Sequence, residues 1–306
     1  MLKRIYKLTY LFLFLFAVSL NLFDCHTNPA GPGLSIFNIY HNKILFTSSR
    51  SGNPQLYMMN PDGTNVIQLT SGKDSWSFQG IWSPNANSIA FTYGSIDTFY
   101  EIPPIYIMSI NGSNRRIVGY GEPMSWSPDG SKIIVQAYDR PLYINNTNNT
   151  NTEIAEKTTL WGGLPDWSPD GKNIIYGYNI DSSNYSIKSY EKIVTYPGFD
   201  SVRVIGPIAG GGFRWSPNGK YFAFDELDHN LYIMNVDGSN TRKITDNNTS
   251  MAFANPRWSP DSNELIFLAS TTDGSNKSYL YMINVNGTNI HRVIDDPTVT
   301  SVNWSK

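Results

Sequence analysis

Short apolar runs separated by turn residues fill the chain from Phe37 onward, without a helical period between them. One clear unit ends a run at Trp258 and continues with Glu264 to Ala269, Tyr279 to Asn284 and His291 to Ile294. Each run is short, rich in β-branched and aromatic residues, and bounded by turn residues, which is typical of β-strands. The pattern predicts units of four antiparallel strands.

These units repeat along the chain. Trp-Ser-Pro begins at five positions roughly 45 residues apart, and a final Trp-Ser lies at the end: Trp82, Trp126, Trp167, Trp215, Trp258 and Trp304. Self-similarity at such a period indicates a repeat architecture. The first unit has no Trp strand before it, and the last Trp strand has no unit after it. The sequence therefore predicts an all-β, six-bladed β-propeller with four antiparallel strands per blade, whose C-terminal strand closes the first blade.

The turns between the runs have clear chemistry. In Ser-Pro-Asp-Gly, Pro presets φ and Gly accepts the positive φ that follows, while Asp-Gly and Asn-Gly pairs mark the next hairpin. The turns at Asn85-Ala86 and Asp261-Ser262 lack the Gly, which indicates a different turn type. The unit after Trp167 is weak, with its third and fourth strands expected at about 185–190 and 201–205. The Asn/Thr tract at 145–152 is expected to be a solvated loop.

The first residues have a different pattern. Three cations precede an almost wholly apolar stretch from Leu8 to Leu20, the order found in secretory signals. We predict a signal peptide at 1–24, a Pro/Gly-rich tether at 25–35 and the propeller at 36–306. Cys25, the single cysteine, lies where a bacterial lipoprotein accepts its lipid. A cleaved, soluble form and an uncleaved anchor are the alternatives, and all three place the protein outside the cytoplasm.

Composition narrows the classes of partner. The chain has 23 Lys and Arg against 25 Asp and Glu, a net charge of −2, and no run of cations. Nucleic-acid binding requires cations that neutralise phosphates, so it is not predicted. We expect a monomer with an envelope protein or peptide as its partner, and with the membrane reached through the lipid anchor.

Trp-Ser-Pro-Asp-Gly, an aliphatic strand and then Leu-Tyr-Ile-Met-Asn-x-Asp-Gly-Ser-Asn resemble the Pro-Asp propeller repeat of the TolB family. The resemblance covers about residues 36–305. It implies a propeller, a binding function and a place in the bacterial cell envelope, either periplasm or outer membrane. The TolB N-terminal α/β domain is not expected in this chain.

The sequence contains no recognisable catalytic constellation. Gly-x-Ser-x-Gly is absent, and the four histidines come from unrelated repeat positions. The Asp residues of the turns lack the spacing of a calcium loop. We therefore predict no enzyme activity, no cofactor and no metal site.

The expected binding site is the channel mouth. In a propeller the Trp strand is innermost, so the residues before each Trp line the axis. The candidates are a polar ring with two flanking aromatic residues: Glu122, Asp166, Arg214, Arg257, Asn303, Trp76 and Trp161. Such a ring could hold an acidic group of a peptide or small ligand. The alternative is that Arg214, Arg257 and Asp166 pair with one another across neighbouring strands.

Three hypotheses of function follow. The leading one is a non-catalytic, lipid-anchored envelope propeller that binds a protein or peptide through its mouth and loops. The second is a carbohydrate-active or lyase-type enzyme that uses the same mouth. The third is a structural scaffold of a surface assembly.

Overall fold

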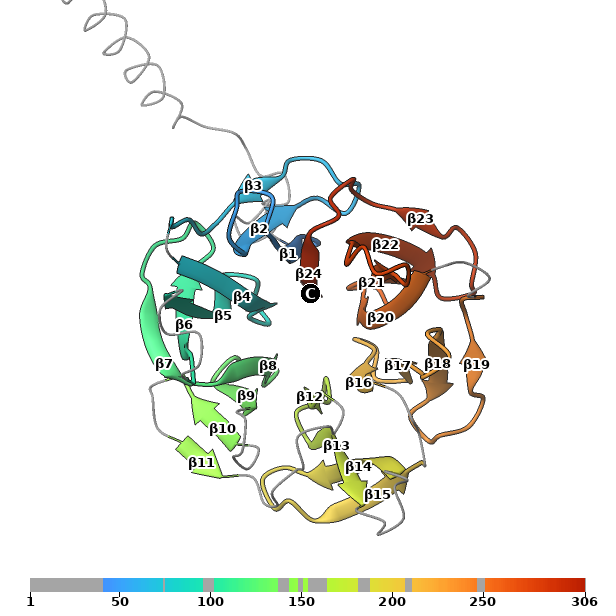
Figure 1. Cartoon of the computed structure of the whole chain (residues 1–306). Helices are drawn as coiled ribbons and strands as arrows, with labels where there is room; N and C mark the ends of the chain where they lie inside the picture. The colour runs from blue at the N-terminus through green and yellow to red at the C-terminus, as the bar shows by residue number, and fades with distance from the viewer. Residues whose placement is uncertain are drawn as a thin grey trace, which may run out of the picture. The chain divides into compact units, whose positions relative to one another are not determined.

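Six four-stranded antiparallel sheets form the blades of a propeller around a central axis (Figure 1). The structure is a computed structural model that describes residues 41–73, 75–95, 102–136, 143–147, 151–153, 164–180, 188–206, 211–246 and 251–305. The predicted signal peptide and tether, with Cys25, and the rim residue Trp161 lie outside the described residues. The predicted fold class is confirmed.

Each blade places its Trp strand next to the axis and its fourth strand at the rim. From the axis outward, blades 1 to 3 are β24 (Val299–Trp304), β1 (Ile44–Ser48), β2 (Gln55–Met59), β3 (Ile67–Gln68); β4 (Ser75–Trp82), β5 (Ser88–Ser95), β6 (Pro104–Ser109), β7 (Arg116–Tyr120); and β8 (Glu122–Trp126), β9 (Lys132–Gln136), β10 (Tyr143–Asn146), β11 (Asn151–Glu153). Blades 4 to 6 are β12 (Asp166–Trp167), β13 (Asn173–Ile180), β14 (Lys188–Thr195), β15 (Ser201–Ile205); β16 (Gly211–Trp215), β17 (Tyr221–Asp225), β18 (Leu231–Asn235), β19 (Arg242–Lys243); and β20 (Met251–Trp258), β21 (Glu264–Thr271), β22 (Ser278–Asn284), β23 (His291–Arg292).

The two ends of the propeller segment meet in blade 1. The last strand, β24, pairs antiparallel with β1, with Ile44 opposite Trp304. The main chain of Ser305 donates to the Lys43 carbonyl at 2.8 Å, and the Ser305 hydroxyl accepts from the Lys43 N–H at 2.7 Å. The predicted closure of the first blade by the C-terminal strand is confirmed.

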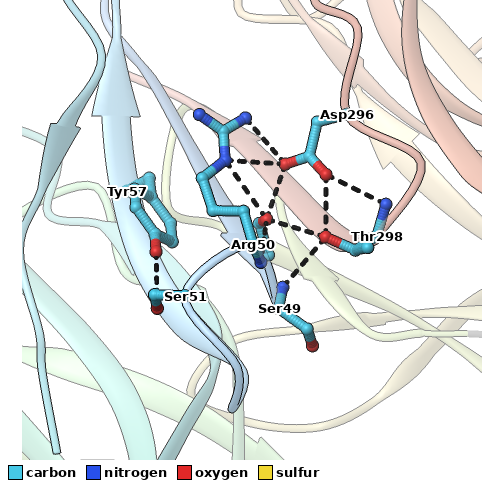
Figure 2. A network of polar contacts seen from close by, with 7 residues as sticks. Ser49, Arg50, Ser51, Tyr57, Asp296 and Thr298 are labelled. Carbon is cyan, nitrogen blue, oxygen red and sulfur yellow. Dashed lines mark hydrogen bonds and ion pairs between the residues drawn. The ribbon is translucent and has the colours of Figure 1, made fainter.

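A buried carboxylate strengthens this closure at the other end of the same strands (Figure 2). Asp296, which precedes β24, accepts from Nε and Nη2 of Arg50 at 2.9 and 2.7 Å. It also accepts from the Ser48 hydroxyl at 2.5 Å and from the main chain and hydroxyl of Thr298 at 3.0 and 2.7 Å. We call this set of four residues the clasp. It joins the β1–β2 turn to the segment that leads into the closing strand.

The hydrophobic core is divided among the blade interfaces. Six clusters of buried side chains exist, each formed by two neighbouring blades, and the repeated Trp lies in the cluster shared with the preceding blade. The indole N–H of Trp258, for example, donates to the main-chain carbonyl of Arg214 at 2.9 Å. The Trp residues are therefore packing residues that join neighbouring blades.

The Trp-Ser-Pro turns all have one conformation. Gly130 has φ of 70°, and its N–H donates to the Ser127 carbonyl. Ala86 and Ser262, which replace this Gly, keep a positive φ of 54° and 63° and the same hydrogen bond. The prediction of a different turn type is therefore wrong. The side-chain and backbone hydrogen bonds of the turn hold a non-Gly residue in a conformation that costs an L-residue about 1–2 kcal/mol.

Two strand predictions also need correction. The third strand of blade 4, expected at about 185–190, extends to Thr195, because residues 191–195 pair with β13 and residues 191–194 also pair with β15. The Asn/Thr tract is not only a loop, since Asn145 is buried in β10 and pairs with Asn151 of β11. Backbone pairing at the edge of a sheet has overridden the poor strand propensity of these residues. The fourth strand at 201–205 is confirmed.

Candidate functional site

A cavity of about 280 Å³ opens on the axis at the end of the propeller where the Trp-Ser-Pro turns lie. All six inner strands contribute to it, and the six residues that precede the repeated Trp all line it: Ile81, Ser125, Asp166, Arg214, Arg257 and Asn303. The register of four inner strands shifts just before these residues, as in a β-bulge. Such irregularities turn a side chain away from the regular pleat and are common next to functional sites.

Three of the polar residues in this ring bind the backbone of the next blade. Oδ1 of Asn303 accepts from the main-chain N–H of Trp82 at 3.0 Å, and Oδ2 of Asp166 accepts from that of Trp215 at 2.9 Å. The hydroxyl of Ser125 accepts from the N–H of Trp167 at 3.2 Å and donates to Oδ1 of Asp166 at 2.7 Å. Both oxygens of Asp166 are therefore engaged in joining blades 3, 4 and 5.

The two arginines of the ring are buried cations. Arg214 is 3% exposed and Arg257 is 8% exposed. Burial lowers the pKa of the Arg214 guanidinium, and Asp166, Asp225 and Glu191 oppose that shift. Burial also lowers the pKa of Arg257 well below its ordinary value, and the positive charge of Arg214 adds to this effect. Asp166 and Asp225 oppose this shift too, so the mouth holds two buried guanidinium groups and two carboxylates that act on both of them.

The arginine hydrogen bonds go to main-chain carbonyls. Nη1 of Arg214 donates to Pro165 at 3.1 Å, and Nε of Arg257 donates to Val302 at 3.1 Å. Among the described residues, no ion pair links either arginine to a carboxylate. The alternative that Arg214, Arg257 and Asp166 form a mutual ion pair is not what the structure shows.

Two buried acids near Arg214 were missed from the sequence. Glu191 of β14 is 3% exposed, and burial raises its pKa to about 8 although Arg214 opposes the shift. Burial also raises the pKa of Asp225, which accepts from the main-chain N–H of Asn255 at 3.0 Å. No pattern in the sequence identifies Glu191, because Lys192 follows it and Ser189 precedes it in the same strand phase.

The remaining predicted residues do not gather at the mouth. Glu122 begins β8, whereas Trp126 at the mouth ends it, and Glu122 does not line the cavity. Burial raises the pKa of Glu122. Trp76 lies near the start of β4 and packs over Gly94, where an added Cβ would meet its ring at 2.5 Å. Their expected place at the mouth is therefore wrong, because each is separated from its Trp by the length of an inner strand.

A groove continues from the mouth between blades 2 and 3. It has a volume of about 340 Å³ and shares Ser83, Pro84, Trp126 and Pro128 with the axial cavity. Its outer end contains Arg116, whose guanidinium donates to the Thr147 carbonyl at 2.6 Å. The mouth and the groove together form a path from the axis toward the outer strands.

Two further features are absent from the described residues. No three or more His, Cys, Asp or Glu side chains in this part of the chain are grouped as a metal would require. Within the same residues, no helix has the length and apolar character needed to cross a membrane.

Comparison with known proteins supports the resemblance seen in the repeats. No family model matches the chain. A TolB homologue of Chlorobaculum tepidum is 30% identical over 132 residues, which cover 41% of this chain and 29% of that protein. A solved TolB-type structure from Agrobacterium tumefaciens superposes with a TM-score of 0.64 at 16% identity, covering 86% of this chain and 99% of that one. The propeller is TolB-like.

Enzymes also occur among the proteins that share this TolB-like architecture. A Bacillus subtilis protein named as an uncharacterized peptidase, YuxL, is 32% identical over 119 residues, which cover 36% of this chain and 17% of that protein. An oligogalacturonate lyase of Vibrio parahaemolyticus superposes with a TM-score of 0.51 at 16% identity over 79% of this chain and 86% of that one. The structural likeness shows a shared fold. The sequence matches span 29% of the Chlorobaculum tepidum TolB homologue and 17% of YuxL.

Proposed function

We propose that this chain is a non-catalytic, lipid-anchored propeller of the bacterial cell envelope that binds a protein or peptide through its channel mouth. The observation that carries the proposal is the cavity on the axis, with two buried arginines and a groove that leads away from it between blades 2 and 3. An extended peptide fits such a path better than a globular surface, because the opening is narrow and lies at the centre of the ring.

The location rests on two supports. Residues 1–24 have the charge and hydropathy pattern of a secretory signal, and Cys25 lies where a lipid would be attached. The TolB-like repeats agree, because the resemblance implies a place in the bacterial envelope. Mass spectrometry of the mature protein tests the anchor. We expect a diacylated or triacylated Cys25 at the N-terminus, and loss of membrane association in Cys25→Ala; an unmodified N-terminus would contradict the anchor.

Catalysis at the mouth has weaker support. General acid-base chemistry requires a carboxyl group that is free to exchange a proton with a ligand. Both oxygens of Asp166 hold groups of the protein, one from Ser125 and one from Trp215. This arrangement suits a residue that fixes the geometry of neighbouring blades, and we therefore favour binding over turnover.

Photo-cross-linking in the native envelope tests the proposed binding face. A photoreactive residue placed at Asn85 lies exposed in the groove, whereas one at Leu227, which is 70% exposed, lies at the opposite end of blade 5. We expect one discrete protein adduct from Asn85 and none of that mass from Leu227. The same adduct from both positions, or from Leu227 alone, would contradict binding at the mouth.

A further inference from the structure

One edge of the Arg214 guanidinium is unoccupied in a buried place. Nη1 donates to Pro165, whereas Nε and Nη2 have no hydrogen-bond partner among the described residues. Nε and Nη2 together form the side of the guanidinium that binds both oxygens of a carboxylate, or one oxygen twice. Arg214 lines the axial cavity, and a buried polar group without a partner is costly, so its unfilled donor pair indicates a missing ligand.

The same chain shows what fills that edge when the protein itself supplies the acid. In the clasp, Nε and Nη2 of Arg50 both bind Oδ2 of Asp296 (Figure 2). Arg214 has the same pair of donors and greater burial, with 3% of the residue exposed, yet the described residues offer it no carboxylate in contact. The difference lies in the partner, because the arginine chemistry is identical.

None of the described acids around Arg214 is hydrogen-bonded to its Nε or Nη2. Asp166 holds Ser125 and Trp215, and Asp225 holds the N–H of Asn255. Burial raises the pKa of Glu191 to about 8, and its Oε2, like the Arg214 edge, has no hydrogen-bond partner in the described part of the chain. Arg257 adds a second cation to the same cavity. Asp166 and Asp225 offset the charges of the two arginines, so the unfilled donor pair of Arg214, rather than an excess of positive charge, favours an incoming carboxylate.

We propose that the open edge of Arg214 binds a carboxylate of the peptide that enters the mouth. This inference rests on the proposed function and names the group that the site recognises. The carboxylate is either an Asp or Glu side chain or a free C-terminus, since both present the same two oxygens. The rest of the segment then leaves the axis along the groove toward Arg116.

Direct binding of short peptides tests the inference without knowledge of the natural partner. The probes are Ac-Ala-Glu-Ala-amide, its neutral match Ac-Ala-Gln-Ala-amide, and Ac-Ala-Ala-Ala with a free C-terminus. Nitrogen-15 NMR of the arginine Nε–H groups is the readout, at low salt and neutral pH. We expect a saturable shift of the Arg214 signal, with a carboxylate peptide binding about tenfold or more tightly than the Gln peptide. The stronger of the two carboxylate probes identifies the source of the group.

Two variants provide the controls. Arg214→Lys keeps the charge but loses the planar fork, and we expect the preference for carboxylate over amide to fall about tenfold. Arg292→Gln removes an arginine that is exposed on β23 and should leave the preference unchanged. Equal binding of the Glu and Gln peptides by the natural protein would overturn the inference, as would binding of oligouronates in place of peptides. If the cross-link at Asn85 persists in that case, the proposed function stands and only the carboxylate assignment fails.

Discussion

The clasp and the channel mouth each contain an arginine, but the two arginines differ in whether the protein supplies a partner for them. In the clasp, the donor edge of Arg50 meets Asp296, whose side chain is 5% exposed and which also binds Ser48 and Thr298. At the mouth, the donor edge of Arg214 meets no described partner, although Arg214 is more deeply buried than Arg50, whose side chain is 32% exposed. An arginine that is satisfied within the fold holds the ring together. One that is buried without a partner and lines a cavity is a candidate to bind a group from outside the fold.

The largest expected effect is loss of the clasp. Asp296→Ala leaves Ser48, Arg50 and Thr298 without their shared acceptor, and it should lower the free energy of unfolding by roughly 3 kcal/mol. Urea unfolding, monitored by tryptophan fluorescence, measures this change in the free energy of unfolding. Asp295→Ala is the matched control. Asp295 forms an ion pair with Arg292, but its side chain is 80% exposed, so its loss should change the free energy of unfolding by less than about 0.5 kcal/mol. Equal effects of the two variants would break the comparison.

The second prediction concerns pH and separates the two regions by sign. The pKa of Asp296 is lowered: burial acts to raise it, but hydrogen bonds from Ser48, Thr298 and Arg50 outweigh burial. The clasp therefore stabilises the fold at pH values above the pKa that Asp296 has in the unfolded chain. This contribution is lost as the pH falls toward the lower pKa of the folded state. The pKa of Glu191 is about 8 in the fold, against an ordinary value of 4.5. As the pH rises from 4.5 to 8, Glu191 therefore ionises in the unfolded chain before it does so in the fold, and the stability of the fold decreases.

Glu191→Gln should remove this second dependence. We expect its melting temperature to exceed that of the natural protein by roughly 3–6 °C at pH 8 and by much less at pH 5. Scanning calorimetry at the two pH values measures the difference. A Gln variant that is less stable at pH 8 than the natural protein would show that Glu191 is ionised and paired in the fold.

The smallest effect, and the sharpest contrast, comes from removing each arginine. Arg50→Met deprives Asp296 of its cation and should cost roughly 1–2 kcal/mol. Arg214→Met removes a buried charge that has no ion pair among the described residues, so the change should stay below about 1 kcal/mol while carboxylate binding is lost. A cost for Arg214→Met as large as that for Arg50→Met would mean that Arg214 serves the fold.

Much of the ring could be predicted because its determinants are local and repeated. The Trp-Ser-Pro turn and the Asp-Gly or Asn-Gly hairpin recur in most blades, and counting them gave six blades and the closing strand. The errors lie where the pattern is weak, at β11 and β14, and at the turns of Ala86 and Ser262. There, pairing with neighbouring strands and the hydrogen bonds of the turn decide the conformation, and neither is visible in a single segment.

The site was predictable only as far as the repeat fixes position. Residues immediately before each Trp lie at the mouth because the Trp register places them there, which is why Asp166, Arg214, Arg257 and Asn303 meet. Glu122 and Trp76 precede their Trp by four and six residues, and at about 3.3 Å per residue they lie well over 10 Å away along the strand. The partners of each side chain depend on contacts between blades, so the open edge of Arg214 could not be read from the sequence.

A crystal structure of the protein with the tighter-binding carboxylate peptide tests the central claim most directly. We expect carboxylate oxygens about 2.7–3.0 Å from Nε and Nη2 of Arg214, with the peptide chain leaving through the groove lined by Pro84 and Pro128. A carboxylate bound at Arg116 or elsewhere on the surface, with the Arg214 edge filled by another group of the protein, would contradict the account.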